Sequence, residues 1–410
     1  MKTSKDKKAL EGVRVVDFTW ALAGPLVTKT LGDFGAEIIK IEREDGEIAR
    51  RVPPFPDRVD VNRAGGFNNR NRNKYGMKLN MKDPRGVELA KKLVSKSHLV
   101  IENYASGVIE KWGLGYDELS KIKPDIIMTS MPGFGHSGPY RRNIGYGQNL
   151  HAFSSWFDLT GYPDRPPSGF SFAYSDYIVG GFATAITLAA LNHWKETGEG
   201  CYIEIPQFET LVGTLGVTYM DYFVNHRAAN RRGNTVPPYV RAAAPHGSYP
   251  CKGEDRWCVI SVFTDEEWKA FRKAIGSPEW TKEDRYSTTL SRLENADELD
   301  KRVASWTREY TPDEVMTILQ EAGVAAGAVR EIRDLVDMDP QMKELKFYVE
   351  AEHPELGKRL FENNVFNLYE TPGKIKRGAP LLGEHTDFIC KEILGMTEDE
   401  INQYLIEGVL

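Results

Sequence analysis

Short apolar runs alternate with amphipathic stretches along this chain, and this alternation strongly limits the folds it can adopt. Residues 13–19 have the pattern of a buried strand, an amphipathic stretch follows a Gly-Pro turn, and residues 37–42 resemble a second strand. A strand, a crossover helix and another strand form a βαβ unit, in which the two strands run parallel. The pattern recurs over residues 83–101 and 124–130. The sequence therefore predicts an α/β fold with a doubly wound, Rossmann-like parallel sheet.

The length of the chain predicts more than one domain. A chain of 410 residues exceeds the roughly 250–300 residues at which single hydrophobic cores stop growing. Residues 231–238 include a glycine, an asparagine and two prolines, which indicates a break between domains. We expect a large domain over residues 1–225, a smaller α+β domain over 226–323, and a C-terminal segment, 324–410, that returns to the large domain.

Charge and hydropathy exclude several classes of protein. The 53 basic and 59 acidic residues give a net charge of −6, whereas nucleic-acid binding usually requires a basic surface. The first residues are polar and no apolar run follows them, so we expect no secretory signal. The apolar run 177–191 is shorter than the ~20 residues that span a bilayer, so a core helix is expected and no membrane partner. Four cysteines without zinc-site spacing predict no metal site and a cytoplasmic location.

Asp176 stands at the start of the long apolar stretch and is a candidate for catalysis. An aspartate at a helix start usually caps free backbone N–H groups, which is a structural role. The same position also keeps a carboxylate ionised and provides N–H groups that can stabilise an oxyanion. Gly180 and Gly181, one turn further on, would let another segment or a ligand approach closely. The residues alone leave both roles open.

Other patterns are less informative. The cation-rich stretch 70–74 could bind phosphate groups, although such stretches are usually solvated surface. The GxGxxG spacing of a nicotinamide site is absent after the first strand. The chain has no GxSxG segment, which disfavours a hydrolase. His136 and His246 show no partner in the sequence and are expected to be ordinary loop histidines.

Segments along most of the chain resemble the class III CoA-transferases, the family of formyl-CoA:oxalate and carnitine CoA-transferases. The resemblance runs from about Leu10 to Leu394, and the order and spacing of its segments make it specific. The matching segments are 10–19, 23–25, 35–43, 79–84, 101–104, 133–139, 159–161, Asp176, 195–200, 322–324, 339–340 and 379–387. The resemblance implies an enzyme that moves coenzyme A between carboxylic acids, with acyl-CoA as substrate and no permanently bound cofactor. It also implies an interlocked dimer.

The resemblance also implies roles for eight residues. Asp176 matches the family's nucleophilic aspartate, which would carry acyl and CoA groups in turn. The other seven match residues along the CoA path: Arg43 at the nucleotide end, Leu79 and Lys82 along the path, Asn103 and Tyr104 beside the pantetheine chain, Lys111 at a phosphate, and Tyr146 near the thioester.

Departures from the family bear on the substrate. Ala21 and Leu22 replace a more polar pair, and residues 242–247 lack the glycine run of the oxalate enzyme, which disfavours oxalate and formate. Six aromatic residues near the expected site are either core or the wall of an acyl pocket: Phe153, Trp156, Phe157, Phe170, Phe172 and Tyr174. If they line a pocket, a bulkier acceptor is expected, such as an aryl- or alkylsuccinate with succinyl-CoA as donor.

Two alternative functions stay open. The α-methylacyl-CoA racemases of the same superfamily have a histidine where this chain has Gly145-Tyr146-Gly147, so the second base of a racemase is missing. The other alternative is a CoA-binding subunit of a heteromeric transferase. We therefore expect either a homodimer or a heterodimer with a related subunit.

Overall fold

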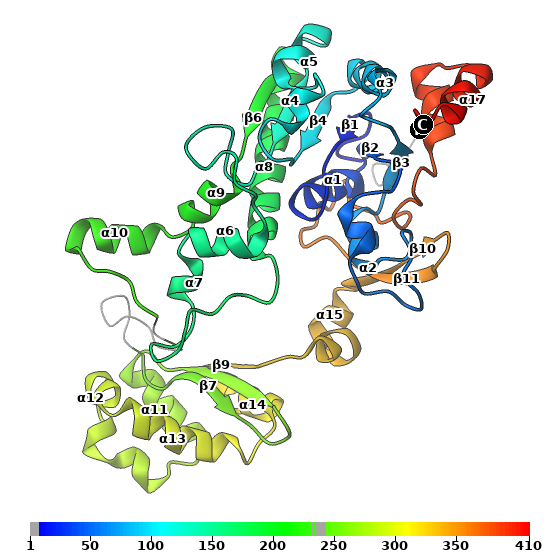
Figure 1. The fold of residues 1–410 in the computed structure, drawn as a ribbon. Helices are drawn as coiled ribbons and strands as arrows, with labels where there is room; N and C mark the ends of the chain where they lie inside the picture. The colour runs from blue at the N-terminus through cyan, green and yellow to red at the C-terminus, as the bar shows by residue number, and fades with distance from the viewer. Residues whose placement is uncertain (1–7, 232, 234–242) are drawn as a thin grey trace. The chain divides into compact units, whose positions relative to one another are not determined.

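The computed structural model describes residues 8–231, 233 and 243–410, and its elements confirm the α/β class (Figure 1). The polar start of the chain and most of segment 231–238 lie outside these residues. The chain divides into two compact units, residues 1–156, 169–227 and 343–410 in the first and residues 157–168 and 228–342 in the second. Helices α7 (Trp156–Leu159) and α15 (Pro340–Glu344) lie where the chain passes between units.

The first unit contains a parallel sheet, a β-hairpin and most of the helices. Its strands are β1 (Arg14–Asp17), β2 (Glu37–Glu42), β3 (Lys74–Lys78), β4 (Leu99–Glu102), β5 (Ile127–Ser130), β6 (Cys201–Glu204), β10 (Tyr348–His353) and β11 (Gly357–Glu362). Its helices are α1 (Ala23–Asp33), α2 (Gly65–Arg70), α3 (Pro84–Ser95), α4 (Val108–Lys111), α5 (Tyr116–Ile122), α6 (Gly147–Phe153), α8 (Tyr174–Thr197), α9 (Gln207–Gly213), α10 (Gly216–Asn225), α16 (Thr386–Phe388) and α17 (Glu398–Ile406), with a π-helical segment at Ile389–Leu394.

The six strands of the main sheet are all parallel and follow the order β3-β2-β1-β4-β5-β6. From β1 the chain winds outward to β3, then returns across the sheet to β4 and winds outward in the opposite direction. This is the doubly wound order, in which the carboxyl ends of β1 and β4 border a crevice where ligands commonly bind. The predicted parallel sheet is therefore present.

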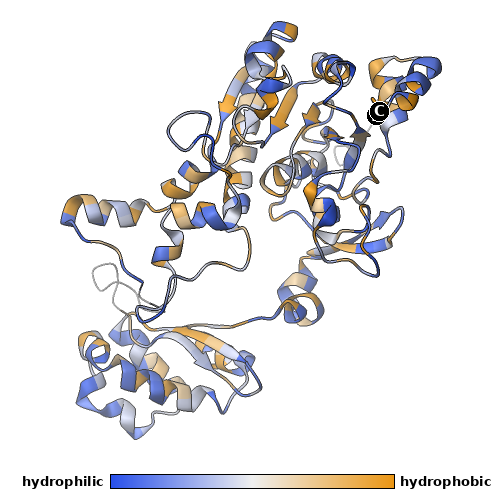
Figure 2. Ribbon diagram, viewed as in Figure 1, coloured by the Kyte–Doolittle hydropathy of each residue, from blue (hydrophilic) through white to orange (hydrophobic). Residues whose placement is uncertain are grey.

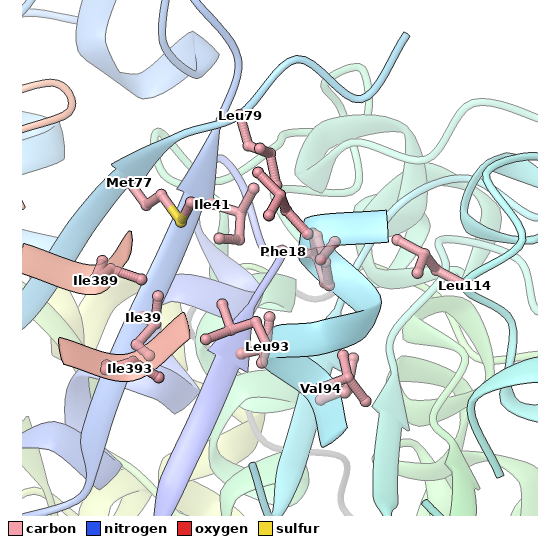
Figure 3. Close-up of a cluster of buried hydrophobic side chains, with 14 of the residues drawn as sticks. Phe18, Ile39, Ile41, Met77, Leu79, Leu93, Val94, Leu114, Ile389 and Ile393 are labelled. Carbon is pink, nitrogen blue, oxygen red and sulfur yellow. The ribbon is translucent and has the colours of Figure 1, made fainter. Parts of the chain in front are cut away.

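The sheet has a hydrophobic core on each face because successive side chains of a strand point to opposite sides. Val15 and Ile38 pack with residues of α1 and α8, whereas Val16 and Ile39 pack with residues of α3 and the C-terminal segment. Figure 3 shows the second cluster, in which Leu93 of α3 lies near the strand residues. The hydrophobic colouring of the strands in Figure 2 follows from this burial on both faces.

The C-terminal segment completes the first unit. Asn80 N–H donates to the carbonyl oxygen of Val409 at 2.9 Å, and His385 N–H donates to that of Gly76 at 2.9 Å. Ile389 and Ile393 belong to the same core cluster as β2 and α3 (Figure 3). These contacts hold the last part of the chain against the edge strand β3.

The second unit has its own antiparallel sheet and core. Its elements are β7 (His246–Pro250), β8 (Trp257–Ser261), β9 (Ala325–Ala328), α11 (Asp265–Ala274), α12 (Thr289–Glu294), α13 (Ala296–Thr307) and α14 (Pro312–Glu321), and β8 lies between β7 and β9. This unit extends past residue 323, where we placed a domain boundary, to Met342. The reason is that β9 pairs with β8 and Arg256 forms an ion pair with Asp334 at 2.8 Å.

Helix α8 is longer than the apolar run that predicted it. It begins at Tyr174, includes polar residues up to Thr197, and ends at Gly198, whose φ of 75° suits a glycine. Its 24 residues make it long and apolar enough to cross a membrane, although the apolar run 177–191 by itself is too short. One third of the most apolar 18-residue stretch of α8 is buried. Core helices of soluble proteins can be equally long and apolar.

Buried ion pairs account for two of the three cations in the stretch 70–74. Lys74 Nζ lies 3.0 Å from Asp17 Oδ2, and Arg72 Nη2 lies 2.7 Å from Asp33 Oδ2, with all four side chains almost fully buried. Burial lowers the pKa of Lys74 to about 8, although the Asp17 carboxylate opposes this. Arg72 and Lys74 are therefore structural cations.

We predict that Lys74→Met lowers the free energy of unfolding by about 3–5 kcal/mol, because it leaves the buried Asp17 carboxylate without this partner. Urea denaturation would measure the loss. Lys91→Met is the matched control, since the Lys91–Glu88 pair at 3.0 Å is more exposed and should contribute at most about 0.5 kcal/mol. Equal losses in the two variants would contradict a buried structural pair.

Candidate active site

A cavity of about 70 Å³ lies at the carboxyl end of the main sheet. Its lining comes from the segments that follow β1, β4 and β5, from the loop before α6, and from α8 and α9. The lining residues are Trp20, Ala21, Asn103, Ala105, Ser106, Pro132, Gly133, Phe134, Arg141, Asn143, Ile144, Gly145, Tyr146, Asp176 and Gln207. The cavity therefore includes the crevice between β1 and β4, where the doubly wound order reverses.

The carboxylate of Asp176 lies where the first turns of two helices meet. Asp176 is the third residue of α8, and its Oδ1 accepts a hydrogen bond at 3.2 Å from the N–H of Ala23, the first residue of α1. Its Oδ2 accepts a hydrogen bond at 3.2 Å from the Ser175 hydroxyl. Helix N-termini carry partial positive charge and free N–H groups, so this position suits an anion.

Burial raises the pKa of Asp176 above its usual value, and three neighbours oppose this effect. The Ser175 hydroxyl and the Ala23 N–H stabilise the carboxylate, as does the positive charge of Arg70. A carboxylate with a raised pKa is more basic and hence a better nucleophile than an exposed one.

Close packing of α8 against α1 holds the two helix starts together. A Cβ atom on Gly180 would lie 3.3 Å from the carbonyl oxygen of Ala23 and 3.3 Å from Leu26 Cβ, so a larger residue would push the helices apart. The close approach expected at Gly180 is therefore present. A Cβ atom on Gly181 would meet no other atom within 4 Å, so Gly181 takes no part in this packing.

Asn103 fixes the loop that follows β1. Its side-chain oxygen accepts from Trp20 N–H at 2.9 Å, and its side-chain amide donates to the Trp20 carbonyl oxygen at 3.1 Å. The next residue, Ala21, has a φ of 61°, which is costly for a residue other than glycine. Glu47 Oε2 accepts from Ala21 N–H at 2.6 Å and helps to hold this conformation.

Three of the eight residues implied by the family resemblance line the cavity: Asp176, Asn103 and Tyr146. Tyr104 follows Asn103 but packs between Trp20 and Trp112, with ring centroids 5.9 and 5.2 Å away. Burial raises the pKa of its hydroxyl.

The other four residues lie outside the cavity lining but near the same end of the sheet. Arg43 directly follows β2, is exposed, and pairs with Asp45 at 2.5 Å. Leu79 directly follows β3, and its side chain is buried in the core shown in Figure 3. Lys82 and Lys111 are exposed.

The aromatic residues of segment 153–174 mostly contact one another. Trp156 packs edge-to-face with Phe170 at 5.8 Å and with Tyr174 at 5.6 Å, while Phe153 packs against Phe134 at 5.2 Å. None of the six aromatic residues named in this segment lines the cavity, whereas Phe134, which sequence analysis did not name as a site residue, does.

Sequence reasoning missed a buried polar network beside the cavity. Glu102 lies at the end of β4. Its carboxylate accepts a hydrogen bond from the Ser130 hydroxyl and another from Tyr104 N–H at 2.7 Å. Ser130 Oγ lies 2.9 Å from His136 Nε2, and His136 Nδ1 lies 3.1 Å from Ser106 Oγ. His136 therefore has partners that its sequence neighbours do not reveal. The sequence around a glutamate at the end of a strand does not show whether its side chain is buried. Burial depends on which strands pair with that strand.

Burial raises the pKa of Glu102 to about 7 from a usual value of 4.5. Because the folded-state pKa is the higher one, the stabilising contribution is fully present below pH 4.5 and is lost as pH rises through 7. The difference between these two pKa values corresponds to about 3 kcal/mol in the free energy of unfolding.

We predict that Glu102→Gln, which mimics the protonated acid, is more stable than the unaltered protein at pH 8 by up to about 3 kcal/mol. The difference should shrink toward zero near pH 4.5. Urea denaturation at the two pH values measures it, with Glu254→Gln as the control, because Glu254 is exposed and lies in the second unit. A stability gap that does not change with pH would show that Glu102 is ionised throughout.

Comparison with known proteins gives a consistent assignment. The family model described as CoA-transferase family III matches residues 10–386. A succinyl-CoA–D-citramalate CoA-transferase of Chloroflexus aurantiacus is 31% identical over 98% of both chains. The beta subunit of a succinyl-CoA–L-malate CoA-transferase of the same organism is 33% identical, also over 98% of both chains. The crystal structure of a CAIB/BAIF family protein from Brucella suis superposes with a TM-score of 0.86 at 30% identity, covering 94% of this chain and all of that one. The chain belongs to CoA-transferase family III and is a CoA-transferase.

Proposed function

We propose that this enzyme transfers CoA from succinyl-CoA to a substituted succinate, with Asp176 as the covalent nucleophile. The observation that carries the proposal is the Asp176 carboxylate, held in a cavity by the N–H of Ala23. The names of the two Chloroflexus relatives support the substrates, since both use succinyl-CoA. Their acceptors, citramalate and malate, are succinates with a small substituent.

In the first half-reaction, Asp176 becomes a CoA thioester. One carboxylate oxygen attacks the thioester carbonyl carbon of the donor, the C–S bond breaks, and CoA leaves as a thiolate. The product is a mixed anhydride between Asp176 and succinate. The thiolate then attacks the Asp176 carbonyl carbon, which releases succinate and leaves aspartyl-CoA.

The second half-reaction repeats these steps in reverse. The acceptor carboxylate attacks the aspartyl-CoA carbonyl and releases CoA thiolate, which gives a second mixed anhydride. The thiolate then attacks the acceptor acyl carbon, so the acyl-CoA product forms and the Asp176 carboxylate is restored. One thioester replaces another, so the reaction needs no ATP.

Groups that hold the Asp176 carboxylate can also stabilise its reaction intermediates. When a thiolate or an acceptor attacks the Asp176 carbonyl, one oxygen becomes an oxyanion. The Ala23 N–H, already 3.2 Å from Oδ1, is suited to hold this oxygen. Losing one such donor typically costs about 3–4 kcal/mol of transition-state stabilisation.

The CoA path is proposed to run from the cavity along the carboxyl end of the sheet. Asn103 and Tyr146, which line the cavity, would flank the pantetheine end, with Tyr104 behind Asn103 and the backbone of Leu79 further along. The exposed cations Arg43, Lys82 and Lys111 would bind the phosphates.

The acceptor is proposed to carry a small substituent. None of the six aromatic residues named in segment 153–174 is part of the cavity lining, so they offer no wall for an aryl group there. The substituents on the acceptors of the two Chloroflexus relatives, a hydroxyl group and in one case also a methyl group, are likewise small.

The racemase alternative has no support in the lining of the cavity. Its residues include no histidine that could act as the second base. His151, near Asp176 in the fold, accepts a hydrogen bond from Ser175 N–H at 2.9 Å through its Nε2 and is fully buried.

We further propose that two chains assemble into an interlocked dimer and that the enzyme works in the cytoplasm. Helix α10 has no buried residue. Its large apolar side chains and several on α8 are exposed: Val217, Met220, Tyr222, Phe223, Val224, Tyr177, Phe182, Ile186 and Leu188. Apolar surface on this scale is typical of a protein interface. The four cysteines form no disulfide, as expected in a reducing compartment.

We predict that Asp176→Ala abolishes CoA transfer, because no other group in the lining of the cavity can form the anhydride. In the unaltered enzyme, incubation with succinyl-CoA followed by hydroxylamine should modify the peptide that contains Asp176, and mass spectrometry would detect this change. Asp117→Asn is the matched control, because Asp117 also lies in the first turn of a helix but outside the cavity. Transfer at the normal rate by Asp176→Ala would refute the mechanism.

We predict that the chain purified alone is active and sediments at twice the mass of one chain. A homodimer satisfies both expectations. If the chain sediments as a monomer and gains activity only with a second, related polypeptide, it is a subunit of a heteromeric transferase, as the alpha and beta subunits among its relatives would suggest.

A further inference from the structure

Among the residues that the structure describes, two charged side chains line the cavity, Asp176 and Arg141. Arg141 lies in the loop between β5 and α6, and its Nη1 donates to the carbonyl oxygen of Gly138 at 3.3 Å. Within the described ranges of the chain, no carboxylate forms an ion pair with it. An arginine that lines the same cavity as a nucleophilic carboxylate, with no protein anion of its own among the described residues, is suited to bind an anionic substrate group.

Arg70 provides a second positive charge near the nucleophile. Its Nη1 donates at 3.3 Å to the carbonyl oxygen of Ala21, which is part of the cavity lining. Its charge also acts on the Asp176 carboxylate. The neighbouring cations Arg72 and Lys74 are neutralised by Asp33 and Asp17, whereas Arg70 pairs with no carboxylate in the part of the chain that the structure describes.

The charges at this site become unbalanced during the proposed reaction. The free enzyme has one carboxylate, Asp176, near two arginines. In the aspartyl-CoA intermediate that carboxylate is a neutral thioester, so both positive charges remain without an anion. An acceptor with two carboxylates supplies two negative charges at this stage, whereas a monocarboxylate supplies one.

We propose that Arg141 and Arg70 bind the second carboxylate of the substrate acid and so select dicarboxylic over monocarboxylic acids. This inference rests on the aspartyl mechanism proposed above. One carboxylate of the acceptor attacks the aspartyl-CoA carbonyl and expels the thiolate, while the other forms charge-assisted hydrogen bonds with the arginines and changes no covalent bond. The free carboxylate of succinyl-CoA occupies the same position in the first half-reaction.

The enzyme should discriminate strongly between dicarboxylic and monocarboxylic acceptors. A site that is built to bind a polar group rejects an analogue without that group by as much as 10⁴–10⁵-fold in buried cases. The two arginines are partly or fully exposed, and water weakens their contacts, so we expect a preference of about 100-fold.

The test uses pairs of acids that differ only in whether a carboxylate or a methyl group ends the chain. Methylsuccinate and 3-methylbutanoate serve as acceptors with succinyl-CoA as donor, and kcat/KM is measured for each. The variants are Arg141→Gln, Arg70→Gln and the double variant. Arg142→Gln is the matched control, because Arg142 is the adjacent exposed arginine and does not line the cavity.

We expect the unaltered enzyme and Arg142→Gln to prefer methylsuccinate by about 100-fold. In Arg141→Gln and Arg70→Gln the preference should fall by about 10-fold or more, chiefly through a higher KM for methylsuccinate, and further in the double variant. Arg141→Lys should restore part of the preference, because it restores the charge. A preference that is unchanged in the double variant would overturn the inference.

A separate measurement distinguishes failure of this inference from failure of the mechanism. Succinyl-CoA and butyryl-CoA are compared as donors by trapping the acylated enzyme with hydroxylamine. If Asp176 is labelled while the double variant keeps the preference for succinyl-CoA, the arginines do not select the substrate but the mechanism stands. If Asp176 is never labelled in active enzyme, the mechanism itself fails, and this inference fails with it.

Discussion

The hydrogen bond from the Ala23 N–H to the Asp176 carboxylate joins the two halves of the doubly wound fold at the cavity. Ala23 begins the helix after β1, and Asp176 lies in the helix that leads to β6. The contact requires the two helices to approach closely, which Gly180 allows. The fold thereby places an acidic side chain of one helix at the positive end of another, and a carboxylate there is both held in position and stabilised as an anion.

Buried charges under the cavity give its edge a fixed shape. The segment after β1 has no regular structure, yet Lys40 Nζ donates to the carbonyl oxygen of Thr19 at 2.7 Å and Glu47 accepts from Ala21 N–H. Lys40 and Glu47 are themselves 3.4 Å apart and buried. A loop held by such contacts keeps catalytic groups at a constant separation, which a solvated loop would not do.

Sequence reasoning predicted the features that depend on local pattern. Hydrophobic periodicity predicted four of the six strands of the main sheet, β1, β2, β4 and β5, so a parallel sheet was foreseen, whereas β3 and β6 were not. Asp176 was found because a helix start is visible in the sequence. In contrast, the burial of Glu102 and the pairing of Lys74 with Asp17 depend on strands that are distant in sequence. Strand β9 has the sequence Ala-Ala-Gly-Ala, which lacks the bulky residues typical of strands, so its pairing with β8 could not be foreseen.

The return of the C-terminal segment to the first unit has a consequence for synthesis of the protein. Ile389, Ile393, Ile401 and Leu410 belong to the core cluster on one face of the main sheet. Until these residues have been added, that face of the sheet is covered only in part, by α3 and its neighbours, although the second unit is already complete. The smaller unit can therefore fold while apolar surface of the larger unit is still exposed, and incompletely folded chains of this kind are prone to aggregate.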